Sequence, residues 1–323
     1  MKRFPVIVVS FSCILTAIMV CGVLNGSVSL SLPELYRGIR SGDAIISMLL
    51  LEIRLPRVLL AAVIGAALSL SGAAFQSFFH NALADPYIIG SSSGAALGAG
   101  IAMSMGLVPV GLYAYIGSLG AVILAFGLAR PISRGASSTT LLLAGTSISY
   151  LCSALLSFVL IIKDKNLNRV YYWLLGSLGG ITWREYAAVP VIAAGCFIIC
   201  MCARHLDLLL QGEEVAESLG VPVQKIRLAV IIGASLTVAA SVSCAGIIGF
   251  VGLAAPHAAR AFTGPVHRRL LPVAALTGAV FLLSADIIAR VIAPPLEIPV
   301  GIITALGGAP FFLYLLARHQ AFQ

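Results

Sequence analysis

Long runs of apolar residues, separated by short polar breaks, extend along the whole chain. A helix of ~20 apolar residues crosses the hydrocarbon core of a bilayer, and each run is close to that length. Counting the runs gives ten expected spans, at residues 4–24, 56–79, 87–106, 110–130, 139–162, 187–204, 228–245, 247–262, 270–291 and 299–317. The pattern predicts an all-α polytopic membrane protein with about ten transmembrane helices, forming a single domain over residues 1–323.

Composition supports this class. Of the 323 residues, 60% are hydrophobic and 10% are charged, whereas an ordinary soluble domain has ~25% charged residues. The 32 glycines suit close helix packing in lipid. A net charge of +8 is ordinary for a membrane protein with basic loops and indicates no nucleic-acid partner. The seven cysteines show no metal-ligand spacing, so we expect no metal site and no cofactor.

The basic residues bear on the orientation. The first run follows Lys2 and Arg3 and lacks the small residues of a signal-peptide cleavage site, so we expect a retained span that starts in the cytoplasm. Ten spans return the C-terminus to the cytoplasmic side. Nine of the twenty Lys and Arg residues would then lie outside, namely Arg37, Arg40, Arg54, Arg57, Lys163, Lys165, Arg169, Arg184 and Arg290. An outer face this basic indicates either the opposite orientation or an acidic partner.

The segment of residues 206–227 differs from the rest because it carries a compact acidic helix. We expect this helix over residues 213–219, with Gly220 at its C-terminal end and Pro222 preventing extension. At ~100° per residue, one face carries Val215, Ala216 and Leu219, and the opposite face carries Glu213, Glu214 and Glu217. Helices in the membrane interface are usually rich in Lys and Arg. The acidic face favours docking on a protein, with an interfacial helix as the alternative.

Three blocks of sequence resemble the FecCD-type permeases, the membrane subunits of ABC importers for iron–siderophore, haem and cobalamin. The first runs from Arg54-Leu-Pro-Arg57 into GAALSLSGAAFQSFFHNALADPYIIGSSSGA, and the second is the acidic helix with its surroundings. The third contains IIGFVGLAAPHAAR, HRRLLP, ADIIAR and PPLEIPVGIITALGGAPFF. The blocks cover most of the chain in matching order. One departure is Ala82, where the family usually has proline.

The resemblance implies a type II ABC importer architecture in a bacterial inner membrane, with both termini cytoplasmic. Two copies of the chain would enclose the pathway, two separate ATPase subunits would bind below, and a substrate-binding protein would dock above. No GxxxxGK[ST] phosphate loop occurs in the sequence, so we expect the ATPase subunits, not this chain, to hydrolyse ATP. Iron–siderophore is the first expectation for the cargo, with haem or cobalamin as alternatives.

The resemblance also assigns roles to individual residues. It places binding-protein docking at Arg54, Arg57 and Arg290, a cytoplasmic gate at Asn81, Leu83, Ser138 and Thr139, and ATPase coupling at Glu213, Glu214, Val215, Ala216, Glu217, Leu219 and Gly220. Simpler roles remain open for several of them. The arginines could anchor helix ends, with Asp286 pairing to Arg290 at i, i+4. Ser138 and Thr139 could cap a helix.

Four further points complete the expectations. His80 could bind haem or simply lie at a helix end. Glu297 is expected to hold the outer loop between Pro295 and Pro299. An ion-coupled secondary transporter is a competing function, but no Asp, Glu, Lys or Arg falls at the centre of an expected span. An intramembrane enzyme would need a nucleophile with its base, and none is visible in the sequence.

Overall fold

The computed structural model describes residues 4–26, 40–129, 138–162 and 167–320, together with residues 33 and 37. Within these residues the regular structure is entirely helical. The long helices are α1 (Phe4–Leu24), α4 (Leu55–Phe78), α5 (Ser91–Met105), α6 (Val110–Ala129), α7 (Ser138–Ile162), α9 (Val189–Met201), α12 (Val223–Ala245), α13 (Val251–Thr263), α14 (His267–Val291) and α15 (Val300–Gln320). Each matches one expected span, and the all-α fold is confirmed.

Several boundaries differ from the expected ones. Helix α12 begins at Val223 rather than at residue 228, so the end of the acidic segment belongs to a long helix. Helix α5 begins at Ser91 rather than at residue 87, because residues 86–90 form turns that end at Gly90 with φ +90°. Seven helical segments in the described part of the chain are long and apolar enough to cross a membrane. Helices α5 and α13 and the apolar part of α15 (Val300–Tyr314) are shorter.

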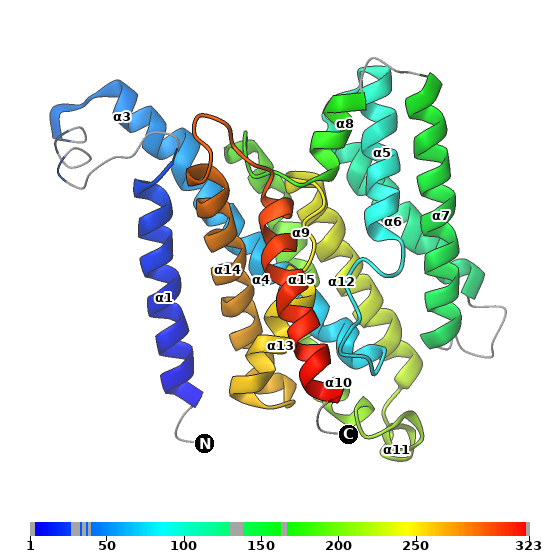
Figure 1. Cartoon of the computed structure of the whole chain (residues 1–323). Coiled ribbons are helices and arrows are strands. Elements are labelled where there is room, and N and C mark those ends of the chain that lie inside the picture. Colours follow the sequence, from blue (N-terminus) through cyan, green and yellow to red (C-terminus); the bar gives the residue numbers. More distant parts are fainter. Residues whose placement is uncertain are drawn as a thin grey trace.

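Short helices connect the long ones. They are α3 (Ala44–Met48), the π-helix η1 (Leu49–Arg54), α8 (Leu167–Leu174), the 3-10 helix η3 (Trp183–Ala188), α10 (Ala203–Leu209) and α11 (Glu213–Ser218). Helices α3 and η1 run directly into α4. Helix α1 begins and α15 ends at the edge of the bundle where α10 and α11 lie, and the turn between α14 and α15 lies at the opposite edge (Figure 1).

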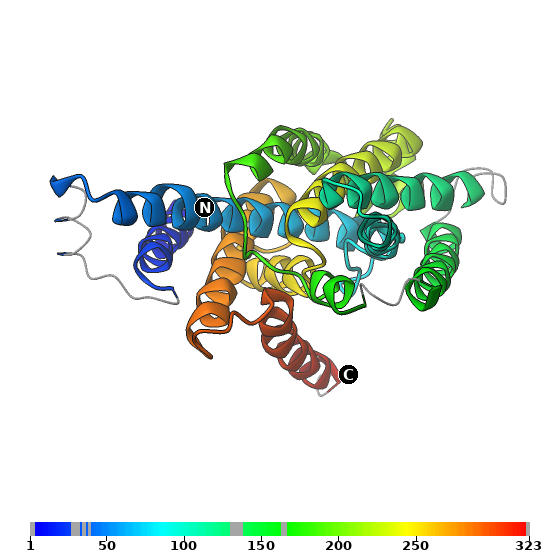
Figure 2. The ribbon, with the colours of Figure 1, turned by 90° about the horizontal axis from the view of Figure 1, so that it is seen from above.

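Helix α4 runs through the middle of the bundle (Figure 2), and most of its residues are buried. Small residues allow this packing, because a Cβ on Gly65 would overlap the backbone of Gly278 in α14. A Cβ on Gly72 would likewise overlap Gly252 in α13. The core is therefore built around α4, with α12, α13 and α14 as its close neighbours.

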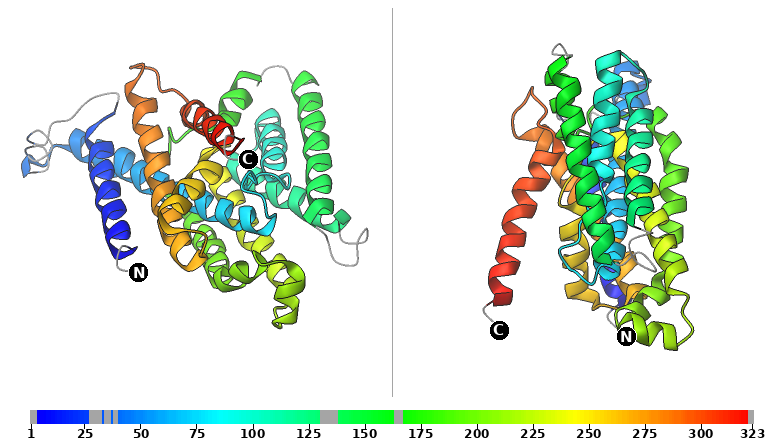
Figure 3. Two further views of the ribbon diagram at one scale, coloured as in Figure 1. Left: turned by 60° about the horizontal axis from the view of Figure 1, so that its bottom comes forward. Right: turned by 90° about the vertical axis from the view of Figure 1, so that its right-hand side faces the viewer.

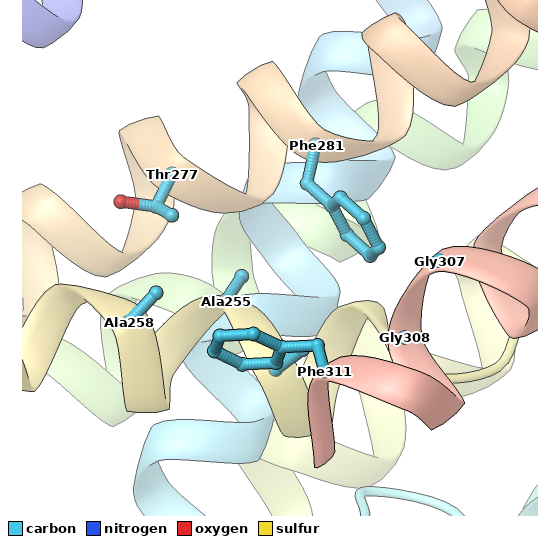
Figure 4. A pocket seen from close by; sticks show the side chains of 8 residues that line it. Ala255, Ala258, Thr277, Phe281, Gly307, Gly308 and Phe311 are labelled. Carbon is cyan, nitrogen blue, oxygen red and sulfur yellow. The ribbon is translucent and has the colours of Figure 1, made fainter. Parts of the chain in front are cut away.

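Helix α15 is set apart from the other helices (Figure 3, right) and packs mainly against α14 and α13. A pocket of about 250 Å³ lies between these three helices. Phe281 of α14 and Phe311 of α15 line it, together with Gly307 and Gly308 (Figure 4). The Thr277 hydroxyl donates to the carbonyl of Val273 at 2.7 Å, so its hydrogen bond is satisfied within α14.

Candidate functional site

A buried cluster of charges joins α4 and α14 near the end where η1 meets α4. Nε and Nη2 of Arg57 donate to Oδ1 of Asp286 at 3.0 and 2.9 Å. Nη1 of Arg57 donates to Oε2 of Glu297 at 2.8 Å. Nη2 of Arg290 lies 2.9 Å from Oδ2 of Asp286, one helical turn away. Two guanidinium groups therefore neutralise the carboxylate of Asp286, which is fully buried.

Arg54 and Arg290 also hold the C-terminal end of α1. Nη1 of Arg54 donates to the carbonyls of Val23 and Leu24 at 2.7 and 2.8 Å. Nη1 of Arg290 donates to the carbonyls of Gly22 and Asn25. The last carbonyls of a helix have no partner within the helix, and cations there also favour the helix dipole. The arginines thus cap α1.

Arg54 and Arg290 thus anchor a helix end, as the simpler alternative expected, whereas Arg57 pairs with Asp286 and Glu297. Arg54, Arg57 and Arg290 are 4%, 7% and 3% exposed. The i, i+4 pair between Asp286 and Arg290 is confirmed, and Glu297 holds the turn between α14 and α15 through Arg57. The three arginines and Glu297 still line a small pocket of about 70 Å³.

The turn after α4 carries two of the expected gate residues. Oδ1 of Asn81 accepts the backbone N–H of Leu83 at 2.8 Å, which shapes the turn, and both residues are exposed. Further along the turn, burial raises the pKa of Asp85 to about 6, while a hydrogen bond from the N–H of Tyr87 favours its charged form.

The other two gate residues begin α7. Thr139 is exposed, and the helix starts at Ser138, whose side chain lies outside the described part. His80 has φ +49° and its Nε2 lies 2.7 Å from the carbonyl of Leu209. This contact ties the turn after α4 to the end of α10 and gives His80 a structural role.

The acidic helix is present as α11, and Gly220 follows it with φ +79°. Glu214 and Glu217 are exposed, and the side chain of Glu213 is not described. Val215 and Leu219 are also exposed, at 46% and 62%.

Ala216 does not share this exposed surface. It is fully buried in the chain's own core, in the same cluster as Leu206 and Leu209 of α10. The expectation that Ala216 shares one contact face with Val215 and Leu219 and takes part in ATPase coupling through it is therefore wrong. A helical wheel gives the angle between side chains, but it does not say which side of the helix packs on its own domain.

The sequence analysis did not identify a cluster of Ser77, His267 and Asp207, which lies where α10 meets α4 and α14. Nδ1 of His267 lies 2.6 Å from Oδ1 of Asp207, and Nε2 lies 2.7 Å from Oγ of Ser77. The same Asp207 oxygen accepts the backbone N–H of His267 at 2.8 Å. Asp207 lies 60 residues from His267, and Ser77 lies 190 residues from it, so no local pattern could have revealed them.

The arrangement resembles a hydrolase triad only in residue type. Ser77 is 1% exposed and His267 is fully buried, so no substrate reaches the hydroxyl. The hydroxyl of Ser77 also donates to the carbonyl of Ala73 at 3.1 Å. The three side chains join α10, α14 and α4 rather than forming a nucleophile.

The long apolar helices of this fold define a polytopic α-helical membrane protein. No cluster of His, Cys, Asp or Glu suited to a metal ion occurs in the residues that the structure covers. The model of the FecCD transport family matches residues 14–318. The chain belongs to this family and is a permease subunit of an ABC importer.

Named relatives agree with this assignment. The chain is 47% identical over 273 residues to the cobalamin import system permease protein BtuC of Halobacterium salinarum, covering 83% of this chain and 73% of the relative. It is 41% identical over 327 residues to the hemin transport system permease protein HmuU of Yersinia pestis, covering 98% and 97%. An inward-facing ABC transporter of the metal-chelate type superposes with a TM-score of 0.86 at 32% identity, covering 97% and 99%.

Proposed function

We propose that two copies of this chain form the membrane pathway of an ATP-driven importer in a bacterial inner membrane, with both termini cytoplasmic. Two separate ATPase subunits would bind at the edge that carries α10 and α11. An extracytoplasmic binding protein would deliver cargo at the opposite edge. The observation that carries this proposal is the match to the FecCD family over nearly the whole chain.

The exposed surface of α11 supports an ATPase contact there. Val215 and Leu219 offer apolar anchors, and Glu214 and Glu217 lie beside them for basic residues at the rim of a groove. The chain contains no phosphate loop of its own, so a partner must supply ATP hydrolysis.

The arginine cluster supports docking of an acidic binding protein through long-range attraction. Arg57 and Arg290 pair with the carboxylates of Asp286 and Glu297, and Arg54 lines the same small pocket, so the groups around it carry one net positive charge. Such a field raises the association rate more than the affinity. Arg54→Gln should slow association of the binding protein, with the effect shrinking in high salt. Arg269→Gln, an equal charge change at an exposed residue of the opposite edge, is the control.

We propose cobalamin as the cargo, in place of the iron–siderophore first expected. The relative with 47% identity imports cobalamin, and the haem permease relative makes haem the second candidate. Both cargoes are metal chelates with a planar macrocycle.

The experiment that tests the cargo compares uptake of labelled cyanocobalamin, haemin and ferrichrome by cells that express the chain with its cognate partners. We expect uptake of cyanocobalamin, and deletion of this chain should abolish it. Uptake of ferrichrome alone would restore the iron–siderophore assignment. Uptake driven by an ion gradient without the ATPases would instead support a secondary transporter.

A further inference from the structure

Helices α4 and α14 are joined along their whole shared length. Near one end, Arg57 of α4 holds the buried Asp286 of α14. In the middle, Gly65 packs against Gly278 so closely that a Cβ on either would overlap the other's backbone. Since the two backbones interlock between polar contacts, the pair is expected to move as one body.

Polar contacts continue the join toward the other end. Oγ of Ser69 in α4 donates to the carbonyl of Ala274 in α14 at 2.7 Å. Beyond it, Oγ of Ser77 lies 2.7 Å from Nε2 of His267 at the first residue of α14. Both hydroxyls are buried, so neither contact competes with water.

Asp207 connects this pair to α10. Its Oδ1 accepts the backbone N–H of His267, one of the N–H groups that the first turn of α14 leaves unpaired, and it also contacts Nδ1 of the ring. A carboxylate at a helix N-terminus is further favoured by the helix dipole. The His80 contact to Leu209 forms a second link between α4's end and α10.

We propose that Asp207, His267 and Ser77 form a joint that transmits movement between the α10–α11 segment and the α4–α14 pair. These residues are positioning residues, and the inference rests on the proposed ATPase contact at α11. The α4–α14 pair carries the arginine cluster at its far end, so the joint connects the two partner-binding edges. Docking of the binding protein would thereby reach the ATPases as a small shift of two packed helices.

The chain offers a matched pair of variants for the test. Ser77 and Ser71 are both buried in α4, and each hydroxyl donates to the carbonyl four residues earlier, at 3.1 and 3.0 Å. Only Ser77 also meets His267. Ser77→Ala and Ser71→Ala therefore make the same chemical change, but only Ser77→Ala removes a contact of the joint.

The experiment reconstitutes each variant with its ATPases in proteoliposomes. It adds the cognate binding protein loaded with cyanocobalamin, haemin or ferrichrome, whichever the wild-type complex transports. We expect Ser77→Ala to assemble and keep basal ATP hydrolysis, while stimulation by the binding protein falls at least ~5-fold, the lower end of typical allosteric coupling. Ser71→Ala should be stimulated like the wild type. Equal stimulation in the two variants would overturn the joint and leave the proposed function standing.

A second pair decides the matter if Ser77→Ala does not assemble. Asp207→Asn keeps an oxygen that can accept the His267 N–H, whereas Asp207→Ala removes it. Stimulation should survive largely in Asp207→Asn and be lost in Asp207→Ala, and equal behaviour of the two would contradict the joint. A wild-type complex that contains no ATPase would overturn the proposed function and this inference together.

Discussion

Arg57 and Asp286 are 229 residues apart in the sequence, yet two guanidinium nitrogens of Arg57 donate to one oxygen of Asp286. Because Asp286 is fully buried and also pairs with Arg290, this contact fixes α4 against α14. Arg57 and Arg290 are therefore buried partners of a carboxylate and not simple surface charges.

Asp286→Ala should destabilise the protein strongly, because it leaves the buried Arg290 without its carboxylate and Arg57 with only the partly exposed Glu297. Breaking a buried ion pair in this way costs about 3–5 kcal/mol. Thermal unfolding in detergent should show a large drop in Tm. Glu297→Ala is the control, since its side chain is 37% exposed and exposed pairs contribute ~0–1 kcal/mol. Similar drops for both variants would show that Asp286 is not the centre of the cluster.

Leu219→Asp should weaken ATPase association, because it places a charge on an exposed apolar side chain of the α11 surface. Losing an anchor residue costs ≥ ~2 kcal/mol, or a ~30-fold change in affinity. Co-purification at equal expression measures this. Glu217→Ala should change association little, since rim charges contribute ~0–1 kcal/mol. Normal association of Leu219→Asp would remove α11 from the ATPase contact. Ala216→Arg is a poor test, because Ala216 is buried in the chain itself.

Cysteines at Leu83 should crosslink between two copies in a nucleotide-dependent way, since a gate must close near the axis that relates the copies. Leu83 is 47% exposed and Thr139 is also exposed, so either position can react. Phe197 of α9 is the control, because it is exposed but does not belong to the proposed gate. Crosslinking at Leu83 that ignores nucleotide would remove this turn from the gate.

Single cysteines at Gln211 and Asn168 should be labelled from opposite sides of the membrane by an impermeant maleimide. Both residues are exposed. Asn168 belongs to α8 and Gln211 lies between α10 and α11, and these helices lie at opposite edges of the bundle (Figure 1). The native cysteines must be replaced first, because Cys13, Cys21 and Cys200 are exposed. Labelling of both from one side would show that the number of crossings between them is wrong.

The long helices could be predicted from sequence because each one follows a largely apolar run. Gly220 and Pro222 marked the end of α11 for a local reason, namely the backbone conformations that they allow or prevent. The burial of Ala216 could not be predicted in the same way, because it depends on where α10 and the core lie.

The contacts that join distant helices were the least predictable. Asp286 and Arg290 are one turn apart, and their pair followed from spacing. The contacts of Arg57 with Asp286 and of Ser77 with His267 depend on how α4 packs against α14. The close contact between Gly65 and Gly278 allows this packing, and neither glycine alone indicates in the sequence which residue it will meet.

The most direct test of the proposed importer is the composition of the complex purified through this chain from native membranes in mild detergent. Mass determination should find two copies of the chain with two ATPase subunits, and the complex should hydrolyse ATP. Purification of the chain without any ATPase, combined with cargo uptake that follows an ion gradient, would contradict the assignment of its transport to ATP hydrolysis.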